Sequence, residues 1–369
     1  MARRVEMLDT ELQADNYRDD ALVMLKRIRP KWNSETITFK RMALGFVNTV
    51  LHVRDQKDES DAGIIQRIFG EAYTTSALQN TKFPELEKKC VLMLAELGLG
   101  PTVQCVFKNG YFSSFLEGKN FEFNGSEHLE DYVIDAIATE IVKWHSPSTA
   151  AAAKEIGFDH TKPYTLVVLR SLLETWPNEA SYKTESSRKT FREEIPSQSV
   201  MLEEVQRIED MLAEFDTPLV FCHNDLNMSN MIYFGDSGRM IFLDFENAGF
   251  NYPAFDIISH IVSSHTGTCV DPTPRMPTDD YILKWIQKYL EKRKARGDIR
   301  DFKQKDVRTI FIQAKKTAPV TQFCLALCII HIATLSIKDD NAHIDFLGIA
   351  AARLKYYFNN RDEAWSLQI

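Results

Sequence analysis

The sequence has no hydrophobic run long enough to cross a membrane and no apolar segment of a signal peptide near its start. The longest apolar stretch, residues 323–337, contains a histidine and covers 15 residues, whereas a membrane-spanning helix needs about 20. The first residues, MARRVEMLDTELQ, include two arginines but no apolar core. We therefore expect a cytoplasmic protein that is not an integral membrane protein.

Paired cysteines and excess positive charge are also missing. The six cysteines are scattered and none forms a C-x-x-C motif, so we expect free thiols and no metal knuckle. The net charge of −8 leaves no basic stripe to neutralise phosphates, which argues against nucleic acid as a partner. Apolar residues at 44% beside 26% charged residues are typical of a soluble globular protein with a sizeable core.

The order of the expected elements indicates the fold class. Residues 17–30 and 83–97 are predicted helices, 36–44, 49–53 and 63–69 are predicted strands, and 102–116 a predicted hairpin. Further on we expect helices over 127–144, 199–215, 279–296, 306–314, 320–337 and 345–358, short strands within 220–243, and a polar stretch over 178–198. Strands followed by a long helical remainder predict an α+β protein of two lobes.

The most informative segment is residues 220–256, VFCHNDLNMSNMIYFGDSGRMIFLDFENAGFNYPAFD. It contains Asp225, then Asn230 five residues later, and an acid pair at Asp244 and Glu246. Phosphoryl transfer from ATP needs a carboxylate for the attacking hydroxyl, and an amide and a carboxylate that fix Mg²⁺ against the phosphates. Either motif alone is most often turn chemistry or a strand end. H-x-D-x4-N followed by D-F-x, in this order, predicts a kinase.

In these residues the chain resembles the choline/ethanolamine kinase family. The family's second signature is an acid-x-acid pair, then N-Y, then F-D-I, and the chain has it between Asp244 and Ile257. The first motif alone would also fit aminoglycoside phosphotransferases. The resemblance covers about residues 40–360 and implies a bilobal protein-kinase-like fold. A small β-rich lobe, 1–118, would hold the nucleotide phosphates, and a mainly helical lobe, 119–369, would carry the catalytic loop, metal site and alcohol pocket.

The resemblance also implies a role for each candidate residue. Asp225 would be the catalytic base, supported by Asn230, and Mg²⁺ would be held by Asn230, Asp244 and Glu246. His223 is expected to be a structural residue of the loop. Contacts to ATP are expected from Gly45, Asn48, Arg67, Glu87, Ser114, Leu116, Asn224 and Ile232. Among these, Arg67 would bridge phosphate oxygens and Glu87 would orient it.

The alcohol pocket departs from the family pattern. We expect substrate contacts from Asp225, Tyr252 and Asn247. Choline kinases of this family enclose the quaternary ammonium with aromatic rings, which attract a cation over their faces. The positions that match those rings are occupied by Asn247, Cys324, Leu327 and Ile349. Recognition of a quaternary ammonium is therefore less well supported than phosphoryl transfer.

The expected activity is ATP-dependent phosphorylation of choline, with ethanolamine as a second acceptor, to give phosphocholine in the first step of phosphatidylcholine synthesis. Three alternatives stay open: an ethanolamine kinase, a kinase of another small alcohol, and a weakly active regulatory pseudokinase that pairs with an active relative. The expected cofactors are Mg²⁺ and ATP, and the expected partner is a small-molecule alcohol. Because members of the family are often dimers, the resemblance also implies a homodimer.

Overall fold

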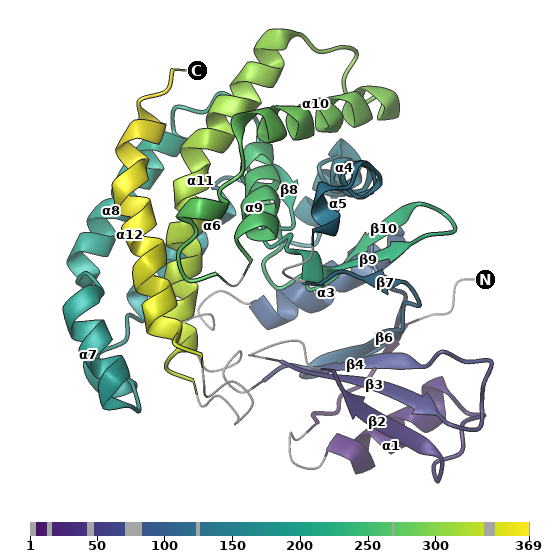
Figure 1. Cartoon of the computed structure of the whole chain (residues 1–369). Helices are drawn as coiled ribbons and strands as arrows, with labels where there is room; N and C mark the ends of the chain where they lie inside the picture. The colour runs from purple at the N-terminus through teal and green to yellow at the C-terminus, as the bar shows by residue number, and fades with distance from the viewer. Residues whose placement is uncertain are drawn as a thin grey trace. The chain divides into compact units, whose positions relative to one another are not determined.

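The computed structural model describes residues 5–12, 17–42, 48–70, 83–122, 126–267, 269–335 and 344–368. Gly45, one of the expected nucleotide contacts, lies outside the described residues. The chain divides into two compact units, Met1–Lys119 and Asn120–Ile369 (Figure 1). Each unit is described by itself below.

The first unit is built on a six-stranded sheet with the order β1-β5-β6-β4-β3-β2. Its strands are β1 (Glu6–Met7), β2 (Ile37–Arg41), β3 (Thr49–Asp55), β4 (Ile64–Ile68), β5 (Val103–Phe107) and β6 (Gly110–Ser114). Neighbouring strands run antiparallel, except that β1 runs parallel to β5. The β5–β6 turn lies at Lys108 and Asn109, one residue before the Asn109-Gly110 pair where the sequence predicts the hairpin turn.

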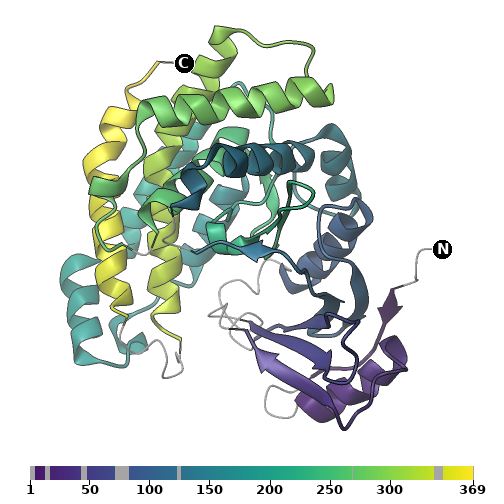
Figure 2. The same ribbon diagram turned by 45° about the vertical axis from the view of Figure 1, so that its right-hand side comes forward.

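One face of this sheet packs against helix α1 (Tyr17–Ile28), as Figure 2 shows. The helix buries Ala21, Met24, Leu25 and Ile28, the spacing of a single apolar stripe. Burial of a large aliphatic side chain stabilises a fold by about 1.5–3 kcal/mol. Alternate residues of a strand point to opposite faces, and Arg67 on the other face pairs with Glu87 of helix α3 (Phe83–Glu96).

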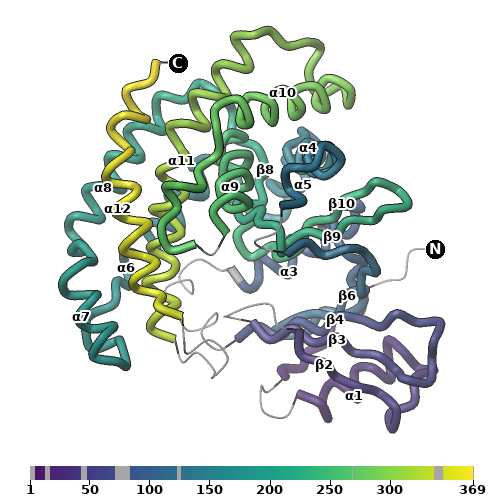
Figure 3. Tube along the Cα trace, viewed as in Figure 1, coloured from purple at the N-terminus to yellow at the C-terminus, as the bar shows by residue number. Residues whose placement is uncertain are grey.

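The second unit is mainly helical. Its helices are α4 (Asp131–Trp144), α5 (Pro147–Glu155), α6 (Tyr164–Glu174), α7 (Glu185–Glu194), α8 (Gln198–Leu212), α9 (Pro253–Thr266), α10 (Asp279–Arg296), α11 (Gln304–Ile332) and α12 (Phe346–Trp365). The tube in Figure 3 shows α11 and α12 side by side along their lengths. No helix in the described part of the chain is long and apolar enough to cross a membrane.

Two small sheets carry the motifs of the second unit. The first has the order β10-β9-β7, with β9 (Met231–Phe234), β10 (Arg239–Phe242) and, at the unit boundary, β7 (Lys119–Asn120). The second is a two-stranded ribbon of β8 (Val220–Cys222) and β11 (Gly249–Asn251). The β9–β10 hairpin lies within the region where the sequence predicts short strands.

Several helices differ from the expectation. The separate helices expected over 306–314 and 320–337 are one helix, α11, which continues through Pro319. Helix α7 forms within the stretch expected to be merely polar, and its N-cap Thr184 accepts a hydrogen bond from the Ser187 amide. It buries none of its own side chains, so no apolar periodicity marks it in the sequence.

Candidate active site

The two motifs meet because β8 and β11 pair antiparallel. Cys222, the last residue of β8, lies opposite Gly249, the first residue of β11. The H-N-D loop therefore leaves the ribbon next to the segment that carries Asp244 and Glu246. Gly249 is required here, because a Cβ at this position would lie 2.6 Å from the ring of Tyr164.

Asp256, the acid of the F-D-I motif, anchors the backbone of this loop. Its side chain is fully buried in α9. It accepts hydrogen bonds from the backbone amides of His223, at 3.0 Å, and Asn224, at 2.8 Å. Burial alone would raise the pKa of Asp256, but hydrogen bonds from the His145 side chain and the His223 backbone amide hold this pKa below its ordinary value. The loop is thus held by a buried carboxylate that stays ionised.

The backbone is strained at two of the candidate site residues. Asn224 and Asp244 have φ of 64° and 65°, and among the described residues they are the only non-glycine residues with positive φ. Asn and Asp tolerate this left-handed region better than other side chains. The surroundings also fix the side chain of Asn224. Its Nδ2–H group donates to the Asn247 carbonyl at 2.9 Å, and its Oδ1 accepts from the Asn251 side chain at 2.8 Å. Such strain is commonly held in place at functional sites.

Asp225 follows directly and is half-buried. Burial, and then the nearby charge of Asp244, raise its pKa to about 7. Hydrogen bonds from Asn227, at 3.1 Å, and Asn230, at 3.3 Å, oppose this rise. A carboxyl group with a pKa near the working pH can accept a proton from a hydroxyl more readily than an ordinary aspartate.

Asn230 lies between the two acids. Its side-chain N–H group donates to the backbone carbonyl and carboxylate of Asp225, which turns the amide oxygen the other way. Its backbone carbonyl accepts a hydrogen bond from the Leu243 amide at 2.8 Å, directly before Asp244. An amide oxygen beside carboxylates that repel each other is a donor set suited to a hard divalent cation. The residues present therefore fit Mg²⁺.

His223 connects the loop to the D-F-E segment. Its Nδ1 accepts a hydrogen bond from the Asp225 amide, and its Nε2 lies 2.8 Å from the Leu243 carbonyl. Burial lowers the pKa of His223, so the ring is neutral and its Nε2–H donates to that carbonyl. This arrangement agrees with the expected structural role.

In the first unit, the structure brings Arg67 and Glu87 together. Arg67 Nε lies 3.0 Å from Glu87 Oε1, and both side chains are buried. Glu87 shares the buried side of α3 with Cys90, Val91 and Leu94, so the helix carries this acid to the sheet on its apolar stripe.

The other expected nucleotide contacts lie in strands or next to them. Asn48 accepts a hydrogen bond from the Gly70 amide at 3.2 Å. Ser114 ends β6 and its hydroxyl accepts from the Thr102 amide, while Leu116 follows in the next loop. Ile232 is buried in β9 of the second unit. Nucleotide contact by these four residues stays a prediction.

The expected substrate residues fall in different places. Asn247 lies beside the loop, with its Oδ1 3.4 Å from the Tyr164 hydroxyl. Tyr252 is packed in the core against Phe215, and its hydroxyl donates to the Leu212 carbonyl at 3.1 Å. The structure therefore does not bring the Tyr252 hydroxyl together with Asp225, because α8 engages it.

Helix α11 places Cys328 near the site, whereas the family pattern indicates Cys324 and Leu327. Leu327 is fully buried. The thiol of Cys328 lies close enough to Asp225 and Glu246 that their charges, added to burial, raise its pKa to about 12. Helix α11 therefore places a thiol near the two acids. The aromatic rings of the family pattern would fall at Cys324 and Leu327 of the same helix.

Sequence reasoning missed two residues that hold the site, Asn227 and His145, and gave no structural role to Asn251 of the N-Y pair, whose side chain donates to Asn224. Asn227 could have been found, because it lies two residues after Asp225 and its side chain also caps the short turn at Met228–Asn230. His145 is 111 residues from Asp256 and bonds it only through the tertiary fold. No local pattern marks such a partner.

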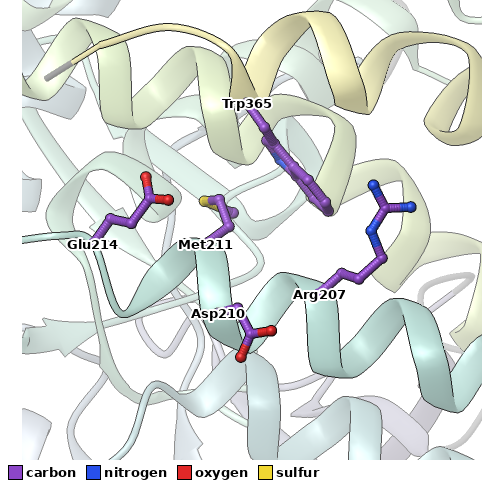
Figure 4. A pocket seen from close by; sticks show the side chains of 5 residues that line it. All are labelled: Arg207, Asp210, Met211, Glu214 and Trp365. Atoms are coloured by element: carbon purple, nitrogen blue, oxygen red, sulfur yellow. The ribbon is translucent and has the colours of Figure 1, made fainter.

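A surface pocket lies elsewhere on the second unit, between α8 and the end of α12. Figure 4 shows its lining side chains, Arg207, Asp210, Met211, Glu214 and Trp365. Its charged groups are already engaged, since Arg207 pairs with Asp362 at 2.8 Å and Glu214 pairs with Lys316 at 2.6 Å. None of its residues belongs to either motif, so we assign the chemistry to the loop and not to this pocket.

Comparisons with known proteins identify the family of this chain. The family model "Choline/ethanolamine kinase" matches residues 39–358. Ethanolamine kinase 2 of Mus musculus is 28% identical over 99% of this chain and 87% of its own length. Ethanolamine kinase 1 of Homo sapiens is 27% identical over 95% of this chain and 74% of its own length.

Solved structures share the fold. An ethanolamine kinase of Plasmodium vivax superposes with a TM-score of 0.70 at 17% identity, covering 91% of this chain and 86% of its own. Choline kinase of Cryptosporidium parvum also gives 0.70 at 17% identity, over 94% and 95%. The expected protein-kinase-like fold, with an N-terminal antiparallel sheet and a mostly helical C-terminal region, is confirmed. The chain belongs to the choline/ethanolamine kinase family, phosphotransferases that use an alcohol group as acceptor.

Proposed function

We propose that the chain is an Mg²⁺-dependent ethanolamine kinase that transfers the terminal phosphoryl group of ATP to the hydroxyl of ethanolamine. The observation that carries the proposal is the grouping of Asp225, Asn230 and Asp244 around one loop. Family membership supplies the use of ATP. The product, phosphoethanolamine, is a precursor for phospholipid synthesis.

In this proposal each residue of the loop has one task. Asp225 orients the acceptor hydroxyl and takes its proton, which its raised pKa favours. Asn230 and Asp244, with Glu246 beside them, would hold Mg²⁺ through their oxygens. Bound Mg²⁺ supplies positive charge against the phosphate oxygens. Arg67, oriented by Glu87, would contact phosphate oxygens from the first unit.

The surroundings of Asp225 favour ethanolamine over choline, the acceptor that the sequence placed first. A primary ammonium prefers carboxylates and hydrogen-bond acceptors, whereas a trimethylammonium prefers aromatic faces. Near the loop the chain offers Glu246, the Asn247 amide and the Cys328 thiol. The relatives named above from mouse and human are ethanolamine kinases, which supports the same choice.

The test is a methylation series. We expect kcat/KM to fall from ethanolamine through its monomethyl and dimethyl forms to choline, by about tenfold or more in total, because a charge-assisted hydrogen bond contributes about 1.5–3 kcal/mol. Asp225→Asn should remove activity with every member. Choline turnover equal to or faster than that of ethanolamine would contradict the proposed acceptor, and inactivity of the wild type on all four would contradict the proposed function.

A further inference from the structure

A chain of buried polar groups runs from α10 to the backbone of the catalytic loop. The Tyr289 hydroxyl lies 2.9 Å from Nδ1 of His145, and Nε2 of His145 lies 3.1 Å from Oδ2 of Asp256. Asp256 binds the amides of His223 and Asn224, which directly precede Asp225. We call Tyr289, His145 and Asp256 the relay. Each of the three residues is at most 2% exposed to solvent.

The proton positions in the relay follow from its chemistry. Asp256 is ionised and only accepts, so Nε2 of His145 carries the proton that lies between them. The Tyr289 hydroxyl donates its proton to Nδ1 of His145, the ring nitrogen opposite Nε2. Burial raises the pKa of Tyr289 well above its ordinary range, so this hydroxyl keeps its proton.

Nε2 of His145 has a second neighbour. The Cys222 sulfur lies 3.6 Å from it, only slightly farther than Asp256. The bond from Tyr289 to the opposite nitrogen fixes the ring in the position where the carboxylate is the nearer partner. Without that bond, Nδ1 would be a buried acceptor without a donor, a state that costs stability and loosens the ring.

We propose that Tyr289 is a positioning residue for phosphoryl transfer, because it holds the His145 ring against Asp256, which in turn holds the backbone next to Asp225. The proposal rests on the proposed function, in which Asp225 is the base. Tyr289 lies on α10, a helix that contributes none of the residues assigned to the reaction. Its effect therefore reaches the loop only through His145.

A metal site is the competing explanation of the same cluster. Donor atoms of His145, Cys222 and Asp256 lie within 4.8 Å of one another, and zinc binds these residue types. However, each donor atom already has a hydrogen-bond partner, and the thiol also faces the carbonyls of Asn251 and Tyr252. Burial and the charge of Asp256 raise the pKa of the Cys222 thiol, which favours a thiol over a thiolate ligand. We therefore assign the cluster to hydrogen bonding.

The test compares two buried tyrosines in the full-length protein. Tyr289→Phe should lower kcat roughly three- to tenfold, as expected for one lost hydrogen bond, with KM for both substrates within about twofold. Tyr182→Phe is the matched control, because Tyr182 is equally buried and its hydroxyl donates to the Ile330 carbonyl of α11 and not to a residue of the relay. Tyr182→Phe should lose about as much stability as Tyr289→Phe and keep the kcat of the wild type.

A second pair of variants separates positioning from packing. His145→Gln keeps a side-chain N–H directed at Asp256, whereas His145→Leu keeps only bulk. We expect the glutamine variant to retain clearly more kcat than the leucine variant. Adding Tyr289→Phe to His145→Leu should cause little further loss of kcat, because the two residues act in series.

Hydrogen exchange gives a readout that does not depend on activity. We expect faster exchange of the His223 and Asn224 amides in Tyr289→Phe, and no such change in Tyr182→Phe. Equal kcat and equal exchange in these two variants would overturn the proposal, as would stoichiometric zinc in the purified protein. An inactive wild type would defeat the proposed function instead, and the exchange comparison would still decide whether the relay positions the loop.

Discussion

At the residue scale, Asp225 is the side chain on which the proposed chemistry depends most. Asp225→Asn keeps the shape of the side chain and removes the proton acceptor. We expect turnover to fall by about 10²–10⁴-fold, with the affinity for Mg²⁺-ATP nearly unchanged. Turnover and nucleotide affinity should be measured in parallel. A variant that retains more than about a tenth of wild-type turnover would contradict the role of Asp225 as base.

Asp225→Asn should also stabilise the ligand-free protein against unfolding. The folded-state pKa of Asp225 is about 7, above the value of about 3.9 in an unfolded chain. The folded state therefore binds this proton more tightly, and its stability falls as pH rises between these two values. We expect Asp225→Asn to unfold at a higher denaturant concentration than the wild type at pH 8, with the difference shrinking toward pH 4. An equal difference at both pH values would exclude this linkage.

Asp244 carries a separate prediction about the metal. Asp244→Asn preserves tolerance of the positive φ and removes a negative charge from the proposed Mg²⁺ ligand. We expect weaker binding of ATP in the presence of Mg²⁺ by isothermal titration, and a smaller change in its absence. Asp236→Asn, at an exposed acid in the β9–β10 turn, is the control. Unchanged Mg²⁺-dependent affinity in Asp244→Asn would show that Asp244 is not a ligand.

The site residues that could be predicted from the sequence are those close together along the chain. One short segment contains Asp225, Asn230 and Asp244, at a spacing typical of kinases. Tyr252 belongs to the same segment, but its side-chain direction depends on Phe215 and the end of α8. His145 enters from far away in the sequence. Local spacing therefore predicts which groups react, and tertiary packing decides which groups support them.

At the element scale, α11 shows how packing overrides a local signal. Pro319 removes a backbone donor and normally costs a helix about 3 kcal/mol, which is why two helices were expected. In the structure Pro319 is buried along with Ala318 and Val320, and α11 packs against α9 and α12. The apolar contacts of a 29-residue helix offset the lost bond, so the helix continues.

Strand β4 carries a second element-scale prediction. Gln66 is fully buried, and neither atom of its amide has a hydrogen-bond partner among the described residues. Its cross-strand neighbours Leu51 and Phe112 belong to the apolar core under α1. An unsatisfied buried polar group costs about 1–3 kcal/mol, so Gln66→Leu should raise the free energy of unfolding by a similar amount.

Denaturant unfolding measures this change. Gln56→Leu is the control, because Gln56 is exposed in the same unit and its replacement should give no comparable gain. A Gln66→Leu variant with the stability of the wild type would indicate that the amide finds partners in solution, such as an internal water.

At the scale of the whole molecule, we expect Arg67 of the first unit to contact the nucleotide phosphates, and the second unit to hold Mg²⁺ and the acceptor. The first unit offers Arg67, buried and paired with Glu87. A guanidinium can bind phosphate oxygens bidentately, which lysine cannot reproduce. The kinetic parameters of the two substrates should therefore respond separately to changes in this unit.

Arg67→Ala should raise KM for ATP by about 10-fold or more, since charge-assisted hydrogen bonds contribute about 1.5–3 kcal/mol, and should change KM for ethanolamine much less. Arg67→Lys should be intermediate. Glu87→Gln should cause a milder form of the same defect, because Glu87 only orients the guanidinium. Lys40→Ala, at an exposed cation on β2, should change neither parameter. If Arg67→Ala raised KM for ethanolamine alone, the sheet would belong to the acceptor side, and the assignment of the two units would have to be reversed.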